Sequence, residues 1–544
     1  MTLQYAPAPL PDELVSHYAR YGYRSDVLIG PLMRRNRDEF GALSAVIDGD
    51  VELTWRQLMD AAARFGGFLE ANGIGPGDVV TWQLPNWWET LVVAYGIWAA
   101  GAVSNPIVPI YREHEMRQVV EAVRPSCIVA PAEFRGYPHA EMISSVCADV
   151  GWKPAALVVL RGSATGWTPY DDTTSASPQI VDTGDADGPA LVGFTSGTTS
   201  GAKGVVHSVR SFMSSPLRAT RAMSYGWRDR SYMPATLAHA TGVLSAISTP
   251  LYTGCSVMLR DHWDAEQAVD DMLTAGVTFS AGATVFVQEI LAVLAARGLD
   301  KLPLSTGYGM GASTVPTSVA EAADDAGMTP RRAFGMTECP SVSSSSQFEP
   351  RAIRCGTDGL IAPGCEVRVC SPEGDDLPYG EIGEFVIRGP QRALGYLNPE
   401  HTREAFDDQG WFHTGDLGYV TAEQALTVTG RVKEIINRGG EKISGREIED
   451  MLVQHPGVVE AAVVPAPHDR LGEQPAAFLL IGGGARPSEE ELATFLRSGG
   501  LAPQKIPRVW RYVDDLPRTP SGKVKKYVLQ AELADGAQTT EESA

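Results

Sequence analysis

The chain has 544 residues, more than one hydrophobic core usually supports, so we expect two or more domains, one of them large. Asp and Glu number 66 against 45 Lys and Arg, and the formal charge of -21 argues against nucleic acid or an anionic membrane as the main partner. Any anionic ligand must therefore be held by a local cluster of donors.

The seven cysteines are scattered and contain no Cys-x-x-Cys pair, which is typical of a reducing compartment and of a chain without a zinc site. The N-terminal residues have no basic segment leading into an apolar core. We therefore expect no secretory signal and a cytoplasmic location.

Residues 53–130 alternate helical stretches with short β-rich runs, a pattern that predicts an α/β sheet with crossover helices. Residues 90–111 are uncharged over about the length of a bilayer span, but Gly96, Gly101, Asn105 and two prolines favour a helix, a turn and a buried strand over a membrane span. We expect no stable membrane insertion. The polar residues 161–188 are predicted to form a long surface connection.

The apolar run 190–194 predicts a strand that leads into the stretch GFTSGTTSGAKGVVH, residues 193–207. This stretch is a poor Walker motif, because Ala202 separates Gly201 from Lys203 and no Ser or Thr follows the lysine. Taken alone, a solvated surface turn explains it as well as an anion cradle built from backbone N–H groups, hydroxyls and one lysine. An open α/β sheet binds ligands at such a position, after the carboxyl end of a strand.

Further along the chain, four short motifs combine glycine with charged or aromatic residues. Each has a bland interpretation, as a helix start, an Asx turn, a charged loop or a solvated basic face. Each also suits nucleotide chemistry: Phe334 can stack on a purine, Glu338 can bind Mg2+, and Asp416 can accept both hydroxyls of a ribose. The motifs are FGMTEC (334–339), GWFHTGDLG (410–418), GRVKEIINRGGEKIS (430–444) and RTPSGKVKKYV (518–528).

Beyond residue 429 the pattern changes to a compact α+β unit of roughly a hundred residues. Ser444 with Glu447 and Ser488 with Glu491 predict two capped helices, and VVEAAVVPA and AAFLLI predict strands between them.

Together and in this order, the motifs resemble those of the adenylate-forming superfamily, which includes acyl- and aryl-CoA synthetases, luciferases and peptide-synthetase adenylation domains. The resemblance runs from about residue 53 to residue 529. It implies an α/β fold: a large N-terminal domain of αβαβα-type subdomains plus a small β-barrel, followed by a small mobile α+β domain. The implied division is 1–431 and 432–544, with the phosphate loop at 195–204 and a hinge near Lys433.

The resemblance also assigns roles to individual residues. Lys523 would bridge the substrate carboxylate and the α-phosphate, Thr337 would touch that phosphate, and Glu338 would hold Mg2+. The ATP and AMP site would consist of Thr195, Ser196, Gly197, Thr198, Thr199, Lys203, Gly311, Ala312, Phe334, Gly335, Met336, Asp416 and Arg431. The CoA channel would be bordered by Arg438, Gly439 and Gly440. In the loop, Ser200 and Ala202 stand where the family usually has glycine and proline, so we expect weaker handling of ATP or pyrophosphate.

The implied activity is an ATP-dependent carboxylic acid–CoA ligase that forms an acyl-AMP and then acyl-CoA, with ATP, CoA and Mg2+ as cofactors and a homodimer as one assembly. The sequence looks most like cyclohexanecarboxylate-CoA ligases, so a cyclic, aromatic or short- to medium-chain acid is expected. The candidate pocket walls are His239, Ala283, Tyr308, Met310 and Met336. His239 matches the family histidine of the acyl pocket, although a core histidine remains an alternative. Loading of a carrier protein and a non-catalytic nucleotide-binding protein also stay open.

Overall fold

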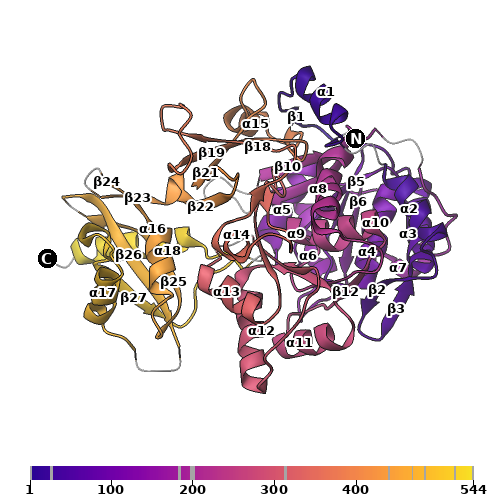
Figure 1. The fold of residues 1–544 in the computed structure, drawn as a ribbon. Helices are drawn as coiled ribbons and strands as arrows, with labels where there is room; N and C mark the ends of the chain where they lie inside the picture. The colour runs from indigo at the N-terminus through magenta and orange to yellow at the C-terminus, as the bar shows by residue number, and fades with distance from the viewer. Residues whose placement is uncertain are drawn as a thin grey trace.

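The computed structural model describes residues 3–24, 28–181, 185–195, 203–311, 315–438, 441–468, 470–482, 486–519 and 522–541. Four sheets organise these residues. Two large sheets with their helices and one small antiparallel sheet make up the larger body, and the fourth sheet forms the smaller C-terminal unit beside it, coloured yellow in Figure 1. The expected fold, a large α/β domain with a small α+β domain, is confirmed.

The first large sheet has nine strands, and its centre is parallel. In spatial order the strands are β1 (Ala6–Pro7), β20 (Gly395–Tyr396), β10 (Lys203–Ser208), β9 (Pro189–Thr195), β5 (Val103–Pro106), β4 (Val79–Trp82), β6 (Cys127–Pro131), β7 (Ala156–Leu160) and β8 (Thr168–Pro169). The pair β9–β10 is antiparallel, so the candidate phosphate loop connects the two arms of a hairpin.

The second large sheet also has nine strands. In order they are β17 (Leu360–Ile361), β16 (Ser343–Ser344), β15 (Pro330–Phe334), β14 (Gly307–Met310), β13 (Phe279–Gly282), β11 (Arg230–Met233), β12 (Ser256–Leu259), β2 (Ser44–Asp48) and β3 (Val51–Thr54). Strands β12, β11, β13, β14 and β15 run parallel, so their carboxyl ends meet at one edge of the sheet.

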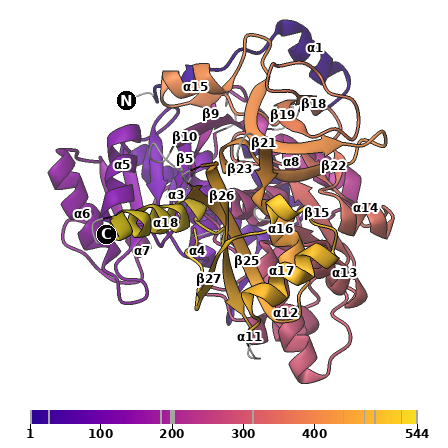
Figure 2. The same cartoon turned by 90° about the vertical axis from the view of Figure 1, so that its left-hand side faces the viewer.

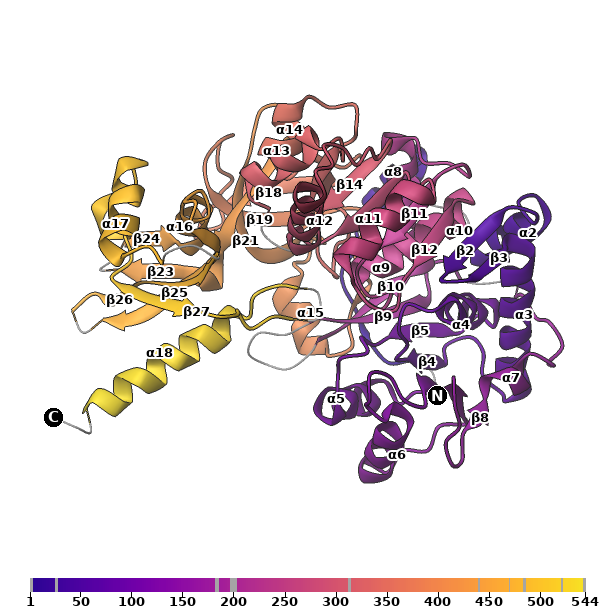
Figure 3. The ribbon, with the colours of Figure 1, turned by 90° about the horizontal axis from the view of Figure 1, so that it is seen from below.

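Helices cover both large sheets, as the two turned views show (Figures 2 and 3). In the larger body they are α1 (Asp12–Arg20), α2 (Ile29–Asp38), α3 (Trp55–Ala71), α4 (Trp88–Ala99), α5 (Glu113–Val123), α6 (His139–Val150), α7 (Tyr170–Thr173), α8 (Val209–Met223), α9 (Ala240–Gly242), α10 (Thr249–Thr253), α11 (Ala265–Thr274), α12 (Thr284–Arg297), α13 (Thr317–Asp325), α14 (Arg351–Gly356) and α15 (Pro399–Ala405), with a π-helical turn at Val243–Ser248.

The uncharged segment 90–111 forms most of α4, a turn at Gly101 with φ 73°, and β5. Helix α4 is apolar because it is buried on every side, and its Tyr95 hydroxyl donates a hydrogen bond of 2.9 Å to the Ile247 carbonyl. The predicted helix, turn and strand are therefore confirmed. Among the residues that the structure describes, we find no helix with both the length and the apolar character needed to cross a bilayer.

The segment 161–188 is more ordered than the surface connection expected from its polar composition. It contributes the edge strand β8 and the short helix α7. Trp167 and Tyr170 are buried and anchor the segment, and these two aromatic side chains explain why it forms regular structure.

The third sheet is antiparallel, with the order β18 (Glu366–Cys370), β19 (Gly383–Arg388), β21 (Phe412–Val420) and β22 (Leu426–Arg431). It occupies the place of the implied small barrel. The pairings run in a line from β18 to β22, and these two outer strands do not pair with each other within the described part of the chain.

The C-terminal unit begins after η2, a 3-10 turn at Val432–Glu434 that contains the backbone of Lys433. Its sheet contains β24 (Glu441–Ser444), β23 (Ile435–Arg438), β26 (Gly472–Ile481), β25 (Val458–His468) and β27 (Val509–Val513), and its helices are α16 (Gly445–Leu452), α17 (Glu489–Ser498) and α18 (Lys526–Glu541). Both predicted N-caps are present: Ser444 accepts from the Glu447 N–H, and Ser488 with Glu491 forms a complete capping box.

Candidate active site

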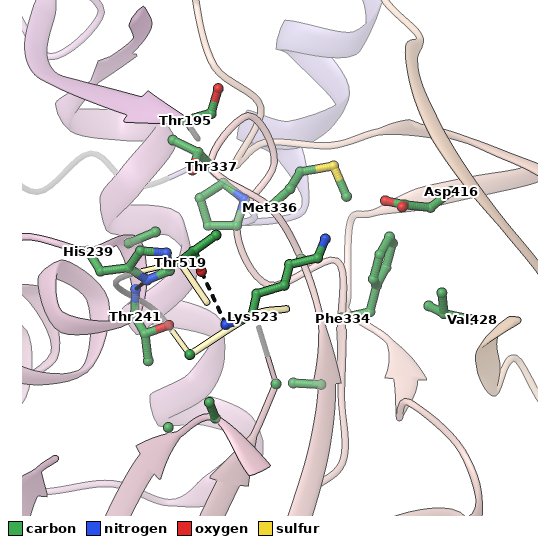
Figure 4. Close-up of a pocket in the computed structure, with 18 of the residues that line it drawn as sticks. Thr195, His239, Thr241, Phe334, Met336, Thr337, Asp416, Val428, Thr519 and Lys523 are labelled. Carbon is green, nitrogen blue, oxygen red and sulfur yellow. Dashed lines mark hydrogen bonds between the residues drawn. The ribbon is translucent and has the colours of Figure 1, made fainter. Parts of the chain in front are cut away.

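A cavity of about 1070 Å³ lies between the larger body and the C-terminal unit. Its walls come from the ends of β9, β14, β15 and β21 and from the turn that precedes α18 (Figure 4). Residues from five of the candidate motifs thus border one space, although they are up to about 330 positions apart in the sequence.

The phosphate-loop end of the cavity is formed by Thr195 and Lys203, which are register partners across the β9–β10 hairpin. The Lys203 ammonium nitrogen lies 5.6 Å from the centroid of the Tyr396 ring. Gly204 packs against Leu397, whose side chain would have to move for any larger residue, because an added Cβ would come within 2.4 Å of Leu397 Cδ1. Ser196, Gly197, Thr198, Thr199, Ser200 and Ala202 lie outside the described residues.

The motif FGMTEC follows β15 directly, so its side chains are placed at the carboxyl edge of the second sheet. Glu338 is partly buried, and desolvation raises the pKa of its carboxyl group above the ordinary value. The Tyr396 hydroxyl donates a hydrogen bond of 2.7 Å to Glu338 Oε1. Gly335 must remain glycine, because a Cβ there would lie 2.6 Å from the Ser341 nitrogen. Phe334 and Met336 line the cavity beside it.

His207 is a site residue that the sequence analysis missed. Its Nε2 donates a hydrogen bond of 2.7 Å to the carbonyl oxygen of Thr337, and its Nδ1 lies 2.9 Å from Ser211 Oγ. Burial lowers the pKa of the imidazole to about 4, so the ring is neutral at pH 7. This histidine ties the strand that follows the phosphate loop to the threonine of FGMTEC. His207 can be recognised as a site residue only from its contact with Thr337, which is 130 residues away in sequence, and not from any local sequence pattern.

Asp416 and Arg431 form the opposite wall. They are register partners in β21 and β22, and Arg431 Nε donates to Asp416 Oδ1 at 2.6 Å. The Asp416 side chain is 9% exposed. Its ion pair with Arg431 fixes one carboxylate oxygen and partly neutralises the charge of the carboxylate. Gly311 directly follows β14 and lines the same cavity, whereas Ala312 lies outside the described residues.

Lys523 is carried by a tight turn. Its backbone N–H donates to Thr519 Oγ1 at 3.1 Å, and the Thr519 N–H donates to the Lys523 carbonyl at 2.7 Å. Gly522, with φ 85°, brings the turn against the start of α12: an added Cβ would lie 3.7 Å from Ala283 Cβ. Burial, and then the nearby Arg431 guanidinium, lower the pKa of the Lys523 ammonium group. Figure 4 shows its side chain in the cavity between His239 and Asp416.

An ion-pair network holds the start of α18, directly after this turn. Lys526, the first residue of α18, places its Nζ 2.7 Å from Glu449 Oε1 and 3.4 Å from Glu434 Oε2. Glu434 is the residue after Lys433, where we expect the hinge. The Glu449 carboxylate also accepts the Val463 N–H at 2.6 Å. The network therefore connects η2, α16 and the turn that carries Lys523.

Four of the five expected pocket-wall residues, His239, Ala283, Met310 and Met336, line the cavity, and we call their part of it the acid end. His239 precedes the short helix α9 as its N-cap, with Nδ1 accepting from the Thr241 N–H at 3.4 Å, and burial lowers the pKa of its imidazole. His239 therefore stands at a helix start that borders the cavity, and its role in the acid pocket stays a prediction.

Tyr308 is not a wall of this cavity. It is fully buried in the core formed with α12 and α13, because side chains alternate along β14 and its neighbours Gly307 and Gly309 occupy the other face. A charged residue that the sequence analysis did not select, Arg331, lines the cavity instead.

Of the CoA-channel candidates, only Arg438 is among the described residues, and it is not brought to the cavity. Arg438 ends β23, where it pairs with Glu441, and it is not among the lining residues. Gly439 and Gly440 lie outside the described residues. Within the described part of the chain, no group of three or more His, Cys, Asp or Glu side chains is arranged to hold a metal ion by itself. The seven cysteines are all free thiols.

The two stacked α/β sheets, the antiparallel third sheet and the small C-terminal unit identify an adenylate-forming enzyme. Residues 33–397 match the AMP-binding enzyme family, and residues 447–523 match the AMP-binding enzyme C-terminal domain. The chain therefore belongs to the AMP-binding enzyme family. The C-terminal match ends at Lys523.

Individual relatives agree with this assignment. The chain is 31% identical over 524 residues to a medium-chain fatty-acid–CoA ligase of Escherichia coli strain K12, covering 95% of this chain and 92% of the relative. It is 28% identical over 547 residues to a salicylyl-CoA synthase/salicylate adenylyltransferase of a Streptomyces species, covering 98% of each. Among solved structures, ATP-bound MatB from Rhodopseudomonas palustris superposes with a TM-score of 0.81 and 27% identity, covering 92% of this chain and 98% of that one.

Proposed function

We propose that the protein joins a carboxylic acid to CoA at the expense of ATP, releasing AMP and pyrophosphate through an acyl-AMP intermediate. The observation that carries the proposal is the position of Lys523 in the same cavity as Thr195, Thr337 and Asp416 (Figure 4). The family membership and the relatives named as acid–CoA ligases support it as well.

In the first half-reaction the substrate carboxylate attacks the α-phosphorus of ATP. Two anions must approach each other, so the chain's main contribution is positive charge and fixed donors. Lys523 would bridge the carboxylate and the phosphate oxygens, Lys203 and the loop after Thr195 would hold the β- and γ-phosphates, and Thr337 would bind the α-phosphate. His207 would position Thr337 through its carbonyl oxygen.

The nucleoside would occupy the edge between β14, β15 and β21. Phe334, Gly335, Gly311 and Ala312 would border the adenine, and Asp416, held by Arg431, would accept the ribose hydroxyls. The Glu338 carboxylate suits Mg2+ held largely by phosphate oxygens, because Mg2+ commonly uses one or two carboxylates beside a nucleotide. When bound, Mg2+ would supply charge neutralisation at the phosphates.

In the second half-reaction the CoA thiol attacks the acyl carbon of the acyl-AMP. We propose that residues 432–544 turn about Lys433, withdraw Lys523, and bring Arg438, Gly439 and Gly440 to the channel beside His239. The mixed anhydride is already activated, so this step needs positioning more than acid–base help. We propose a compact acid, cyclic, aromatic or of short to medium chain length. The assembly we expect is a homodimer in the cytoplasm.

The proposal is tested by incubating the purified protein with ATP, Mg2+ and a panel of cyclic, aryl, arylalkanoic and straight-chain acids, with and without CoA. We expect pyrophosphate release with a subset of the acids and a thioester only when CoA is present. No pyrophosphate with any acid would favour a non-catalytic nucleotide-binding protein.

A second candidate function is transfer of the acyl group to a carrier protein. One relative, 28% identical, is a 2,3-dihydroxybenzoate-AMP ligase of Bacillus subtilis, which is named for the adenylate and not for a thioester. Acyl-AMP that accumulates in the presence of CoA but is consumed by a phosphopantetheinylated carrier domain would favour this candidate.

A further inference from the structure

Arg331, in β15, is a buried cation at the acid end of the cavity. Its side chain is 2% exposed, yet it lines the cavity together with Met223, Tyr225 and Phe279. It lies three residues before Phe334, so at a strand rise of about 3.3 Å it is on the order of 10 Å below the edge where we place the nucleotide. This is the depth at which the far end of a compact acid would lie.

The sheet register directs Arg331 into the cavity. Ala281, Gly309 and Arg331 are neighbours across β13, β14 and β15, so their side-chain positions share one face of the sheet. Ala281 and Gly309 are both lining residues. The absence of a side chain at Gly307 leaves room for the guanidinium, because a Cβ there would lie 3.1 Å from Arg331 Nε.

The hydrogen bonds of Arg331 leave its charge without a counter-ion. Its Nη1 and Nη2 donate to the Met223 sulfur and to the Tyr225 hydroxyl, both neutral groups. Its Nε has no hydrogen-bond partner, and none of the ion pairs formed by the described residues includes it. A guanidinium stays protonated in proteins, so this is a buried positive charge with donors to spare.

The adjacent Arg332 shows what a structural arginine looks like in the same strand. It points to the other face, where Nη2 and Nε donate to Asp358 Oδ1 at 2.7 and 3.2 Å and Nη1 donates to the Cys355 carbonyl at 2.8 Å. Buried charges in folded proteins are normally paired in this way. Arg331 lacks such a partner and borders a cavity, which suggests that its partner is a ligand.

We propose that Arg331, with Tyr225, binds a second carboxylate at the far end of the substrate, so that the enzyme prefers a compact dicarboxylic acid. The inference rests on the proposed acid–CoA ligase activity. The Tyr225 oxygen accepts a hydrogen bond from Arg331, so its own O–H can donate a further hydrogen bond to a ligand beside it. A carboxylate accepts several hydrogen bonds and also neutralises the guanidinium, whereas a neutral carbonyl group does only the first.

This substrate class adds a second carboxylate to the cyclic, aromatic or short- to medium-chain acid that the sequence suggested. Phe279 stacks on Tyr225 with ring centroids 4.4 Å apart, and Ala281 and Gly309 lie on the same face of the sheet as Arg331. The walls of the cavity can therefore hold a short methylene chain or a ring, while its floor is polar. Terephthalate and adipate have the required shape: a compact apolar centre with a carboxylate at each end.

The test compares pyrophosphate release for matched acids: adipate against hexanoate, and terephthalate against benzoate, with 4-acetylbenzoate as a neutral acceptor. In the wild type we expect a higher kcat/KM for the diacid of each pair, with 4-acetylbenzoate between terephthalate and benzoate. In Arg331→Met we expect the diacid-to-monoacid ratio to fall by about a hundredfold or more, because a site built for a polar group discriminates strongly. We also expect Arg331→Met to use hexanoate with a higher kcat/KM than the wild type does. A misfolded variant could not gain activity in this way.

Further variants sharpen the result. Tyr225→Phe keeps the stacking on Phe279 and should lose part of the preference, and Arg331→Lys should keep part of it. Arg228→Met, a change at an exposed arginine that does not line the cavity, should leave the ratio near the wild-type value. Hexanoate preferred over adipate in the wild type, with a ratio that Arg331→Met does not change, would overturn the inference while leaving the ligase activity in place. Absence of pyrophosphate with every acid would instead refute the proposed function.

Discussion

Replacing Lys523 by alanine should abolish acid activation while leaving CoA transfer intact. The turn that carries the lysine is held by hydrogen bonds between Thr519 and the Lys523 backbone, so the substitution leaves these bonds in place. The ammonium group is repelled by Arg431 and attracted by Glu434 and Asp416, so its removal should change the stability of the fold little. The loss therefore falls on the reaction.

The magnitude follows from the position of the charge. A preorganised donor facing a developing anion in a shielded site typically contributes about 3–4 kcal/mol, which corresponds to a loss of several hundredfold in rate. Acid-dependent exchange of pyrophosphate into ATP reports the first half-reaction. Thioester formation from a synthetic acyl-AMP and CoA reports the second. An equal loss in both assays would refute the idea that Lys523 acts only where two anions meet.

The pH dependence gives an independent check. Burial and Arg431 lower the pKa of Lys523 from its usual 10.5, so the ammonium group loses its proton at a lower pH than an exposed lysine would. Adenylation requires the protonated form, so its rate should decline on the alkaline side as pH rises through this lowered pKa. In Lys523→Arg the residual activity should persist to higher pH, because a guanidinium stays charged. The same alkaline decline in both proteins would assign the titration to another group.

Three more predictions concern the surrounding structure. His207 is buried in its neutral form, with a pKa of about 4 against 6.5 in the unfolded chain. The free energy of unfolding should therefore fall by about 3 kcal/mol in total as the pH falls from 6.5 to 4. In urea unfolding, His207→Gln should lose less stability over the same pH range. Lys526→Met should slow adenylation about tenfold or more, because it frees Glu434 beside the expected hinge, and Lys526→Arg should restore the rate. If the rates of both half-reactions are unchanged in Lys526→Met, the ion-pair network has no part in the mechanism. Arg332→Met should cost about 3–5 kcal/mol in thermal unfolding by leaving Asp358 buried and unpaired, and the double change with Asp358→Leu should recover part of that loss.

Much of the fold could be predicted from sequence because its signals are local. Apolar alternation, capping residues and glycines placed the strands and helices of both domains, as at Ser488 and Glu491. The pairing of Asp416 with Arg431 also agrees with the motif-based expectation that both contribute to one site. Each of these features depends on residues close together in sequence or on a motif with a fixed order.

The rest depends on contacts between distant segments, which no local pattern encodes. His207 and Thr337 are 130 residues apart, and Arg331 meets Tyr225 across 106 residues. Tyr308 belongs to the expected pocket wall, but its face of β14 packs against α12 and α13. The sequence offered one signal for Arg331, which is its position next to Arg332 in one strand. Side chains alternate along a strand, so the two arginines point to opposite faces, and both faces of this sheet are covered, so each buried charge needs a partner.

The position of Gly522 close to Ala283 has a kinetic consequence. The turn that delivers Lys523 rests on the same helix start that borders the acid, so the two share one volume. An acid too long for its end of the cavity would still bind through its carboxylate and apolar stem, but it would prevent the turn from seating. Excess length should therefore appear as a lower kcat for adenylation, with KM for the acid little changed. In this arrangement the enzyme discriminates against long acids in the step that seats the turn of Lys523, and not through the strength with which it binds the acid.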